Sequence, residues 1–216
     1  MNGIPGGARP TAGGPRPPLA WPLLGAAGLV LGACGSSPAP DLYVLGAAPA
    51  PVVVAAPQAG LPVIEVKPVG VPDYLDTTDL LVRHGEGQMV ASQTGRWGER
   101  LSAGVTRALA AALATRLPRM AVTASPPVER PARQVLVDTE AFEARADDEV
   151  VLVAHWSITD GGPRQTLTSE RVSLAEPVAG TGDGAVVAAM TRATEGLATR
   201  IAAGLERTSA AARGPR

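Results

Sequence analysis

Cysteine, aromatic residues and net charge are all scarce in this chain of 216 residues. It contains one Cys, two His, three Trp, two Tyr and one Phe, and 19 basic against 20 acidic residues give a formal net charge of −1. A single cysteine excludes a disulfide framework and a zinc site built from paired cysteines. The balanced charge offers no electrostatic footprint for nucleic acid. We therefore predict no metal site and no nucleic-acid partner.

The first 33 residues are organised like a secretory signal peptide. Residues 1–18 carry Arg9 and Arg16 without any acid, and the apolar segment Leu19–Leu31 follows them. A helix needs about 20 residues to span a bilayer, and this segment is shorter. A short apolar segment after a basic start, closed by small residues, predicts a cleaved export signal.

The apolar segment ends in Leu31-Gly32-Ala33-Cys34, which resembles the bacterial lipobox. The resemblance implies cleavage between Ala33 and Cys34, and a diacylglycerol and an N-acyl chain on Cys34. Two acyl chains suffice for stable membrane anchoring. The alternative is a free thiol, which would be a liability in an oxidising compartment. Gly35 after the cysteine, where a retained lipoprotein would carry aspartate, indicates the periplasmic face of the outer membrane.

Residues 34–61 are rich in proline and alanine and predict a tether between this anchor and a folded domain. Proline-rich spacers are extended, at about 3.1 Å per residue, so this one could reach roughly 80 Å. Alternatively, Tyr43 and its neighbours dock on the domain as an edge strand and shorten the tether. The sequence leaves both alternatives open.

Residues 62–208 predict one mixed domain, and residues 209–216 predict a disordered tail. Strand patterns occur at Val63–Val69, Leu80–Arg83, Met89–Val90, Val135–Phe142, Val150–Ile158 and Thr166–Leu174. Apolar residues at every fourth position predict a helix over Arg96–Leu117, and a second helix begins near Asp183. This order favours an α+β fold, a two-layer sandwich of a mostly antiparallel sheet packed by two amphipathic helices.

Catalytic motifs are missing from the sequence, which contains no nucleophile elbow, Walker loop, HExxH or GxGxxG opening a helix. The glycines at 180–184 could offer amides to an anion, and the carboxylates at 147–149 could bind a cation. We interpret them as a loop and a hairpin tip. His84 and His155 lie on separate segments, and we interpret His155 as a satisfied or exposed side chain. We predict no enzyme and no cofactor besides the acyl groups on Cys34.

Three stretches of the domain follow one another in a distinctive order: Pro68-Val69-Gly70-Val71-Pro72-Asp73-Tyr74-Leu75-Asp76, Leu80-Leu81-Val82-Arg83 and Arg96-Trp97-Gly98-Glu99-Arg100-Leu101. Tyr43-Val44-Leu45 after the lipobox and Ala154-His155-Trp156 in a late strand extend the pattern. Together these stretches resemble the PqiC-type ABC-transport auxiliary lipoproteins. The resemblance covers nearly all of the chain after Cys34.

The resemblance implies an auxiliary, docking subunit that works with an inner-membrane transporter and an MCE-domain protein. Such systems move phospholipid or other hydrophobic molecules between the two membranes and support envelope integrity, and a homo-oligomeric ring is also implied. Tyr74, Leu75 and Trp97 are the candidate partner-binding residues, with a core position as the alternative for each. Arg83 could pair with an acid across the sheet or recognise a carboxylate on a partner, and we favour the structural pair. Two other functions stay open: an activator or scaffold of peptidoglycan synthesis, and a periplasmic lipid carrier.

Overall fold

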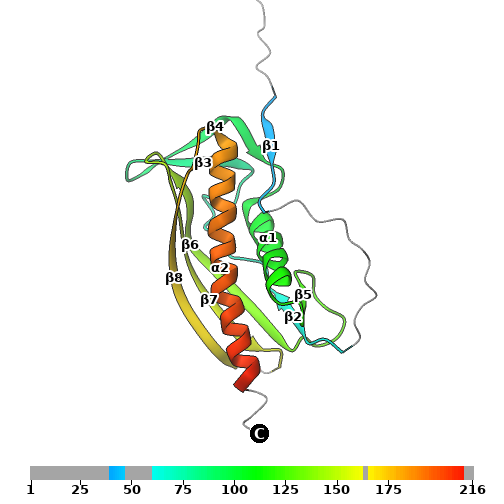
Figure 1. Ribbon diagram of the computed structural model, residues 1–216. Helices are drawn as coiled ribbons and strands as arrows, with labels where there is room; N and C mark the ends of the chain where they lie inside the picture. The colour runs from blue at the N-terminus through cyan, green and yellow to red at the C-terminus, as the bar shows by residue number, and fades with distance from the viewer. Residues whose placement is uncertain (1–38, 47–59, 163–164, 212–216) are drawn as a thin grey trace, which may run out of the picture. The chain divides into compact units, whose positions relative to one another are not determined.

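A computed structural model describes residues 39–46, 60–162 and 165–211, which belong to one compact unit, Pro38–Arg216. The predicted signal peptide, Ala33, Cys34, residues 47–59 of the predicted tether and residues 212–216 lie outside the described residues. The elements, in chain order, are β1 (Asp41–Tyr43), β2 (Val63–Val66), β3 (Asp79–His84), β4 (Gln88–Trp97), α1 (Leu101–Arg116), β5 (Ala121–Thr123), β6 (Arg133–Arg145), β7 (Glu149–Asp160), β8 (Thr166–Pro177) and α2 (Asp183–Ala211) (Figure 1).

Strand β7 lies between the two other long strands and pairs with both in antiparallel register. Its predicted alternation is confirmed, because every second side chain is at most 1% exposed: Val150, Leu152, Ala154, Trp156 and Ile158. Side chains of successive strand residues point to opposite faces, so these five line the core face of the sheet.

Strand β6 keeps both of its halves on the core by means of a bulge. Thr139 and Ala141 pair with consecutive residues of β7, which leaves Glu140 as the inserted residue. One inserted residue reverses the phase of the alternation. The buried side chains therefore change from odd positions (Val135, Val137) to even positions (Phe142, Ala144) across the bulge.

The prediction of a mostly antiparallel sheet is only partly correct, because the sheet is mixed. It has eight strands, and four of the seven pairings among the described strands are parallel: β1–β4, β2–β5, β2–β6 and β3–β6. The parallel pairings are short and join strands far apart in the chain, whereas hairpins join neighbours in antiparallel register. Local alternation predicts that a strand exists but contains no information about the direction of its partner.

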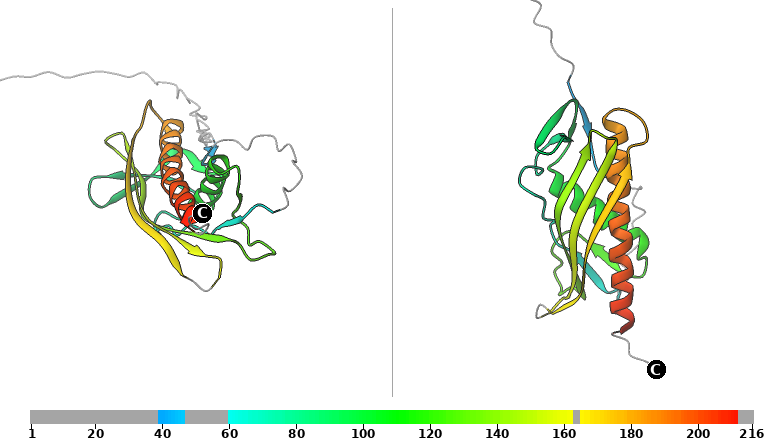
Figure 2. Two further views of the ribbon diagram at one scale, coloured as in Figure 1. Left: turned by 60° about the horizontal axis from the view of Figure 1, so that its bottom comes forward. Right: turned by 90° about the vertical axis from the view of Figure 1, so that its left-hand side faces the viewer.

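Helices α1 and α2 both lie on one face of the sheet, and the long strands curve behind α2 (Figures 1 and 2). The predicted apolar side of α2 is confirmed at Met190, Leu197, Ile201 and Leu205, all at most 3% exposed. Gly204 lets α2 approach the sheet closely, since a Cβ there would lie 2.7 Å from Trp156 Cη2. The two-layer arrangement of the prediction is therefore present.

Several element ends differ from the prediction. The first helix begins at Leu101 rather than Arg96, because Arg96 and Trp97 end β4 and pair with β1. Helix α2 continues through residues 209–211, which were expected in the tail. Strand β5 lies in the proline-rich connection, where no strand was predicted. It has only three residues, too few for a recognisable alternation, and it is held by its pairing with β2.

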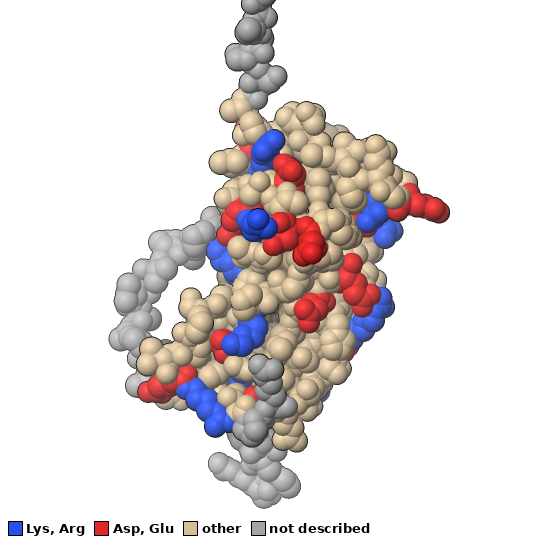
Figure 3. All heavy atoms as spheres, turned by 180° about the vertical axis from the view of Figure 1, so that it is seen from behind, with Lys and Arg blue, Asp and Glu red and all other residues tan. Residues whose placement is uncertain are grey.

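Acidic and basic side chains are intermixed on the face of the molecule opposite the view of Figure 1 (Figure 3). Arg171 of β8 and Glu140 at the β6 bulge form an ion pair at 2.7 Å. The hydrogen bond from Arg171 lowers the pKa of Glu140, although both side chains are at least half exposed. Neither sign of charge dominates this face, which agrees with the balanced composition.

Candidate functional site

The segment that follows Cys34 in the sequence is docked on the domain at β1. Asp41, Leu42 and Tyr43 pair in parallel with Gly95–Trp97 of β4, and the Gly98 amide donates to the Tyr43 carbonyl oxygen at 2.8 Å. Between the two alternatives for the proline-rich segment, the structure favours the docked edge strand. The family-typical stretch at 43–45 is thus part of the fold.

Leu45 and Gly46 extend this docked segment between the two helices. The Leu45 side chain is 1% exposed, and the Gly46 amide donates to Thr191 Oγ1 of α2 at 3.2 Å. Gly46 has φ +86°, a conformation that favours glycine, and a Cβ there would lie 3.0 Å from Ala108 Cβ of α1. Both the backbone conformation and the close approach therefore require glycine at this position.

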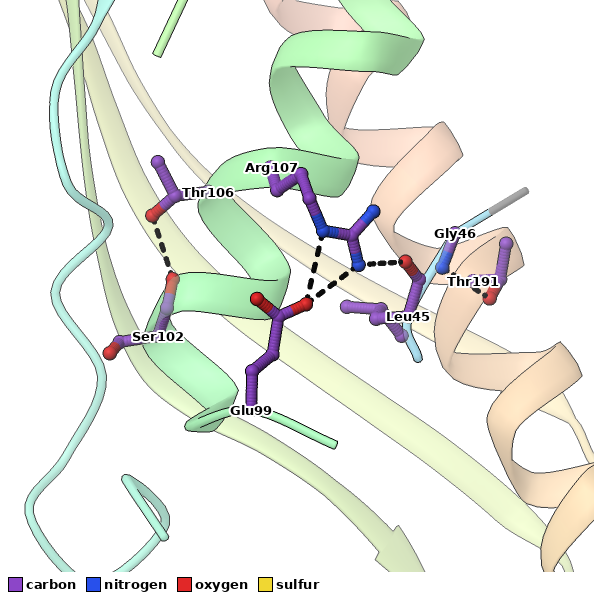
Figure 4. A network of polar contacts seen from close by, with 7 residues as sticks. All are labelled: Leu45, Gly46, Glu99, Ser102, Thr106, Arg107 and Thr191. Atoms are coloured by element: carbon purple, nitrogen blue, oxygen red, sulfur yellow. Dashed lines mark hydrogen bonds and ion pairs between the residues drawn. The ribbon is translucent and has the colours of Figure 1, made fainter. Parts of the chain in front are cut away.

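Arg107 of α1 also forms a hydrogen bond with the docked segment. Its Nη2 donates to the Leu45 carbonyl oxygen and to Glu99 Oε1, both at 2.8 Å, and its Nε donates to the same Glu99 oxygen at 3.0 Å. Figure 4 shows the guanidinium between the carboxylate and the backbone of the docked segment. We call Leu45, Gly46, Glu99, Arg107 and Thr191 the clasp.

The clasp sets how far the domain can lie from an anchor at Cys34. Asp41 lies seven positions after Cys34, and an extended chain spans at most about 3.6 Å per residue. The reach is therefore about 25 Å while β1 is docked, rather than the roughly 80 Å of an undocked tether. Two exposed apolar side chains, Leu42 (71% exposed) and Val44 (53%), stand on the docked segment itself.

A second polar site lies at the far end of β3, where Arg83 meets Glu143 of β6. Arg83 donates from Nε to Glu143 Oε1 and from Nη2 to Glu143 Oε2, the latter at 2.8 Å. The hydrogen bonds with Glu143 raise the pKa of Arg83. The Glu143 side chain is only 4% exposed, so the pair is largely shielded from water. The expected structural partner of Arg83 is confirmed and is Glu143.

Comparison with known proteins assigns the fold and the family. A family model described as ABC-type transport auxiliary lipoprotein component matches residues 43–202, from β1 into α2. The chain belongs to the ABC-type transport auxiliary lipoprotein family. The family is defined by an auxiliary transport component rather than by an enzymatic activity. No sequence among the curated proteins matches significantly.

Two crystal structures support the fold of this auxiliary lipoprotein. An uncharacterized protein is 21% identical with a TM-score of 0.64, and the alignment covers 77% of this chain and 98% of that chain. Protein XCC0632 from Xanthomonas campestris, of family DUF330, is 16% identical with a TM-score of 0.60, covering 81% of this chain and 96% of that chain. At these identities the likeness shows the fold alone.

The three candidate partner-binding residues of the auxiliary lipoprotein occupy different environments. Leu75 is 3% and Trp97 is 5% exposed, so both are core residues in this structure and offer no surface to a partner. Tyr74 is 46% exposed, and its hydroxyl donates to Glu143 Oε2 at 3.4 Å. Of the three, only Tyr74 is available for a partner contact.

The remaining sequence candidates do not gather into a site. His84 and His155 are exposed on different strands, and residues 146–148 form the turn of the β6–β7 hairpin, as interpreted from the sequence. The carboxylate of Asp183, at the start of α2, accepts the hydroxyls of Ser92 and Thr94 at 2.8 and 2.7 Å. The carboxylate of Asp183 therefore already lies at the start of α2, where the glycines at 180–184 were considered as an anion site.

No helix in the described part of the chain is both long and apolar enough to cross a bilayer. Nor do three or more His, Cys, Asp or Glu side chains in that part converge as metal ligands would.

Sequence reasoning missed the clasp entirely. Arg107 lies on a helix whose apolar repeat was recognised. A charged side chain on the polar side of such a helix is normally interpreted as exposed to solvent. Thr191 is 145 residues from its partner Gly46. The one local signal was Tyr43-Val44-Leu45-Gly46, a short apolar stretch closed by glycine inside a proline-rich segment.

Proposed function

We propose that this protein is an outer-membrane-anchored periplasmic lipoprotein that acts as the docking subunit of an MCE-linked intermembrane lipid transport system. The match of residues 43–202 to the transport auxiliary lipoprotein family carries the proposal. The lipobox at Leu31–Cys34 supports the anchor, and the sequence lacks the motifs of common enzyme classes. Inner-membrane transporter subunits and an MCE-domain protein are the proposed partners, and assembly into a homo-oligomeric ring belongs to the same proposal.

The docked N-terminal segment supports a position close to the anchoring membrane. Leu42 and Val44 are exposed apolar side chains within ten residues of Cys34. With a reach of about 25 Å, the β1 end of the domain lies beside the lipid surface while the clasp holds. The opposite end is then turned toward the periplasm.

The anchor is tested by fractionating cells that produce the wild-type chain, Cys34→Ala or the control Ser36→Ala. The wild type and Ser36→Ala should sediment with the outer membrane and resist a salt wash, because two acyl chains anchor stably. Cys34→Ala should be released into the periplasm or remain as the uncleaved precursor in the inner membrane. Retention of Cys34→Ala in the outer membrane after the wash would show that lipid is not the anchor.

The partner is tested by introducing a photo-crosslinking amino acid at Tyr74, with exposed Glu86 as the control position. Crosslinks from position 74 to an MCE-domain protein or a transporter subunit are expected. A crosslink to a penicillin-binding protein instead would favour the peptidoglycan function and overturn the transport proposal. Crosslinks between copies of the chain would report the ring.

A further inference from the structure

A groove of about 920 Å³ lies at the end of the domain where α1 and α2 finish. Its floor is apolar and includes Ile64, which is 1% exposed, Leu117, which is 3% exposed, and the partly buried Met120. The volume is within the range of about 300–1,000 Å³ that is typical of small-molecule sites.

Three arginines surround this floor and face one acid. Arg116, Arg119 and Arg133 line the groove together with Glu206, a clear excess of positive charge in a chain whose total is near zero. Three arginines elsewhere in the described part of the chain are paired closely with an acid. Arg83, Arg107 and Arg171 each donate to a carboxylate at 2.8 Å or less.

The groove arginines lack such partners among the described residues. Arg116 donates to the Thr199 hydroxyl and the Ala112 carbonyl, both at 3.1 Å, and Arg119 is exposed with no hydrogen bond or ion pair in that part of the chain. Arg133 Nη1 donates to the Ala132 carbonyl at 2.7 Å and reaches Asp160 at 3.4 Å, and its buried Nε has no acceptor among the described residues. Guanidinium groups in this state have free capacity for an anion with several oxygen atoms.

We propose that this arginine groove binds an anionic amphiphile, with a phosphate head on the arginines and an acyl chain on the apolar floor. Guanidinium forks match phosphate oxygens with paired hydrogen bonds, and the floor removes methylene groups from water. The assignment gives this subunit a binding site for the lipid moved in the transport role proposed above, and it rests on that role.

The position of the groove fits a hand-over of cargo away from the anchor. A Cβ at Gly184, in the first turn of α2, would lie 3.9 Å from the Tyr43 ring of β1, whereas Glu206 near the end of α2 lines the groove. The two residues are 22 positions apart, which corresponds to roughly 33 Å of helix. Figure 1 shows β1 near the start of α2, with β2 and β5 at the other end. The groove is thus remote from β1 and faces the periplasmic side.

The proposal is tested by calorimetric titration of residues 35–216, which contain every described residue of the compact unit. The probes are oleoyl lysophosphatidylglycerol below its micelle concentration, uncharged monooleoylglycerol with the same chain, and glycerol phosphate without a chain. We expect the first to bind at least tenfold more tightly than either of the others, since head and chain contribute separately.

Charge variants make the test specific to the groove. Arg119→Gln should weaken binding of the lysophospholipid about tenfold, and Glu206→Gln should tighten it about threefold. Arg200→Gln, on α2 but outside the groove, removes the same charge and should leave binding unchanged. Arg119, Arg200 and Glu206 are exposed, so the three variants should keep the wild-type thermal unfolding midpoint.

Equal binding of the charged and uncharged lipids, or equal losses in Arg119→Gln and Arg200→Gln, would overturn the proposal. Binding of glycerol phosphate as tight as that of the lipid would make the groove a plain anion site. Tighter binding of an oligoglutamate peptide would make it a protein-docking site. Any of these outcomes, with the Cys34 fractionation and the Tyr74 crosslink intact, would reject the groove while leaving the transport function standing.

Discussion

The guanidinium of Arg107 holds the backbone of Leu45, 62 residues earlier in the chain, through a hydrogen bond of 2.8 Å to its carbonyl oxygen. Leu45 follows β1, so this contact joins the docked N-terminal segment to the first helix. Glu99 accepts from the same guanidinium and fixes its orientation. The docking of the N-terminal segment therefore depends on a side chain in the middle of α1.

Replacing Arg107 should loosen β1 without unfolding the domain. In Arg107→Ala, the hydrogen exchange of the Gly98 amide should accelerate, because that amide donates to the Tyr43 carbonyl only while β1 is docked. The free energy of unfolding should fall by about 1–2 kcal/mol. NMR-detected exchange checks the first effect, with Arg200→Ala as the control. Unchanged protection at Gly98 would mean that the clasp does not hold β1.

Gly204 should not tolerate alanine although it lies inside a helix. Alanine stabilises an ordinary helix interior by about 1 kcal/mol relative to glycine. At Gly204 the new Cβ would lie 2.7 Å from Trp156 Cη2 and 3.0 Å from Ile158 Cδ1. We expect Gly204→Ala to destabilise the protein by about 1–3 kcal/mol in urea denaturation. Gly104→Ala is the matched control, since its nearest neighbour lies at 3.5 Å and its stability should stay equal or rise.

Asp76 should make the stability depend on pH at the start of α1. The N-cap residue Arg100 provides no side-chain hydrogen bond, and Asp76 Oδ1 instead accepts the Ser102 amide at 3.0 Å. This backbone hydrogen bond, assisted by Arg100, lowers the pKa of Asp76. Because the folded pKa lies below the unfolded value of about 3.9, the stabilisation is present above that pH and is lost as the pH falls through the folded pKa.

The corresponding measurement compares urea denaturation of the wild type and Asp76→Asn between neutral pH and pH 2. The variant should be less stable by about 1 kcal/mol at pH 7, and the difference should shrink below about pH 4. Asp73→Asn, at an exposed position of the same loop, is the control. A difference that stays constant over this range would show that the charge of Asp76 plays no part.

Alanine substitutions at Trp97 and Tyr74 should have different effects, the first on stability and the second on partner binding. The Trp97 ring is 5% exposed, so Trp97→Ala should cost about 3–5 kcal/mol of unfolding free energy. Tyr74→Ala removes a half-exposed ring and a 3.4 Å hydrogen bond and should cost less than about 1.5 kcal/mol. Recovery of the transporter partner should fall only in Tyr74→Ala at equal protein level. A stable Trp97→Ala protein without partner binding would reverse these roles.

Glu143 should be more costly to lose alone than together with Arg83. Glu143→Gln leaves the Arg83 guanidinium without its charge partner and should destabilise by about 3 kcal/mol. The double variant Arg83→Met, Glu143→Leu replaces the shielded pair by apolar groups and should recover most of that loss. Thermal or urea unfolding measures both. A double variant as unstable as the single one would mean that the strands need this ion pair itself.

The sequence by itself determined the features that depend on a local pattern. Strict alternation located β7, the four-residue repeat located the cores of α1 and α2, and the ordered stretches around Tyr74 and Trp97 indicated the family. The alternation and the four-residue repeat each lie within one element. They record which face of that element is apolar, and burial of that face follows from the hydrophobic effect.

Only the tertiary structure decided what those elements meet. Three features join segments that are distant in the chain. They are the parallel pairing of β1 with β4, the hydrogen bond from the Gly46 amide to Thr191, and the grouping of Arg116, Arg119 and Arg133 around one groove. The bulge at Glu140 likewise becomes visible only against β7. Hydrogen bonds and guanidinium contacts are directional and require a particular partner, whereas hydrophobic burial accepts any apolar neighbour. A single sequence therefore indicates which side chains are buried, whereas the hydrogen-bonding partners are known only from the fold.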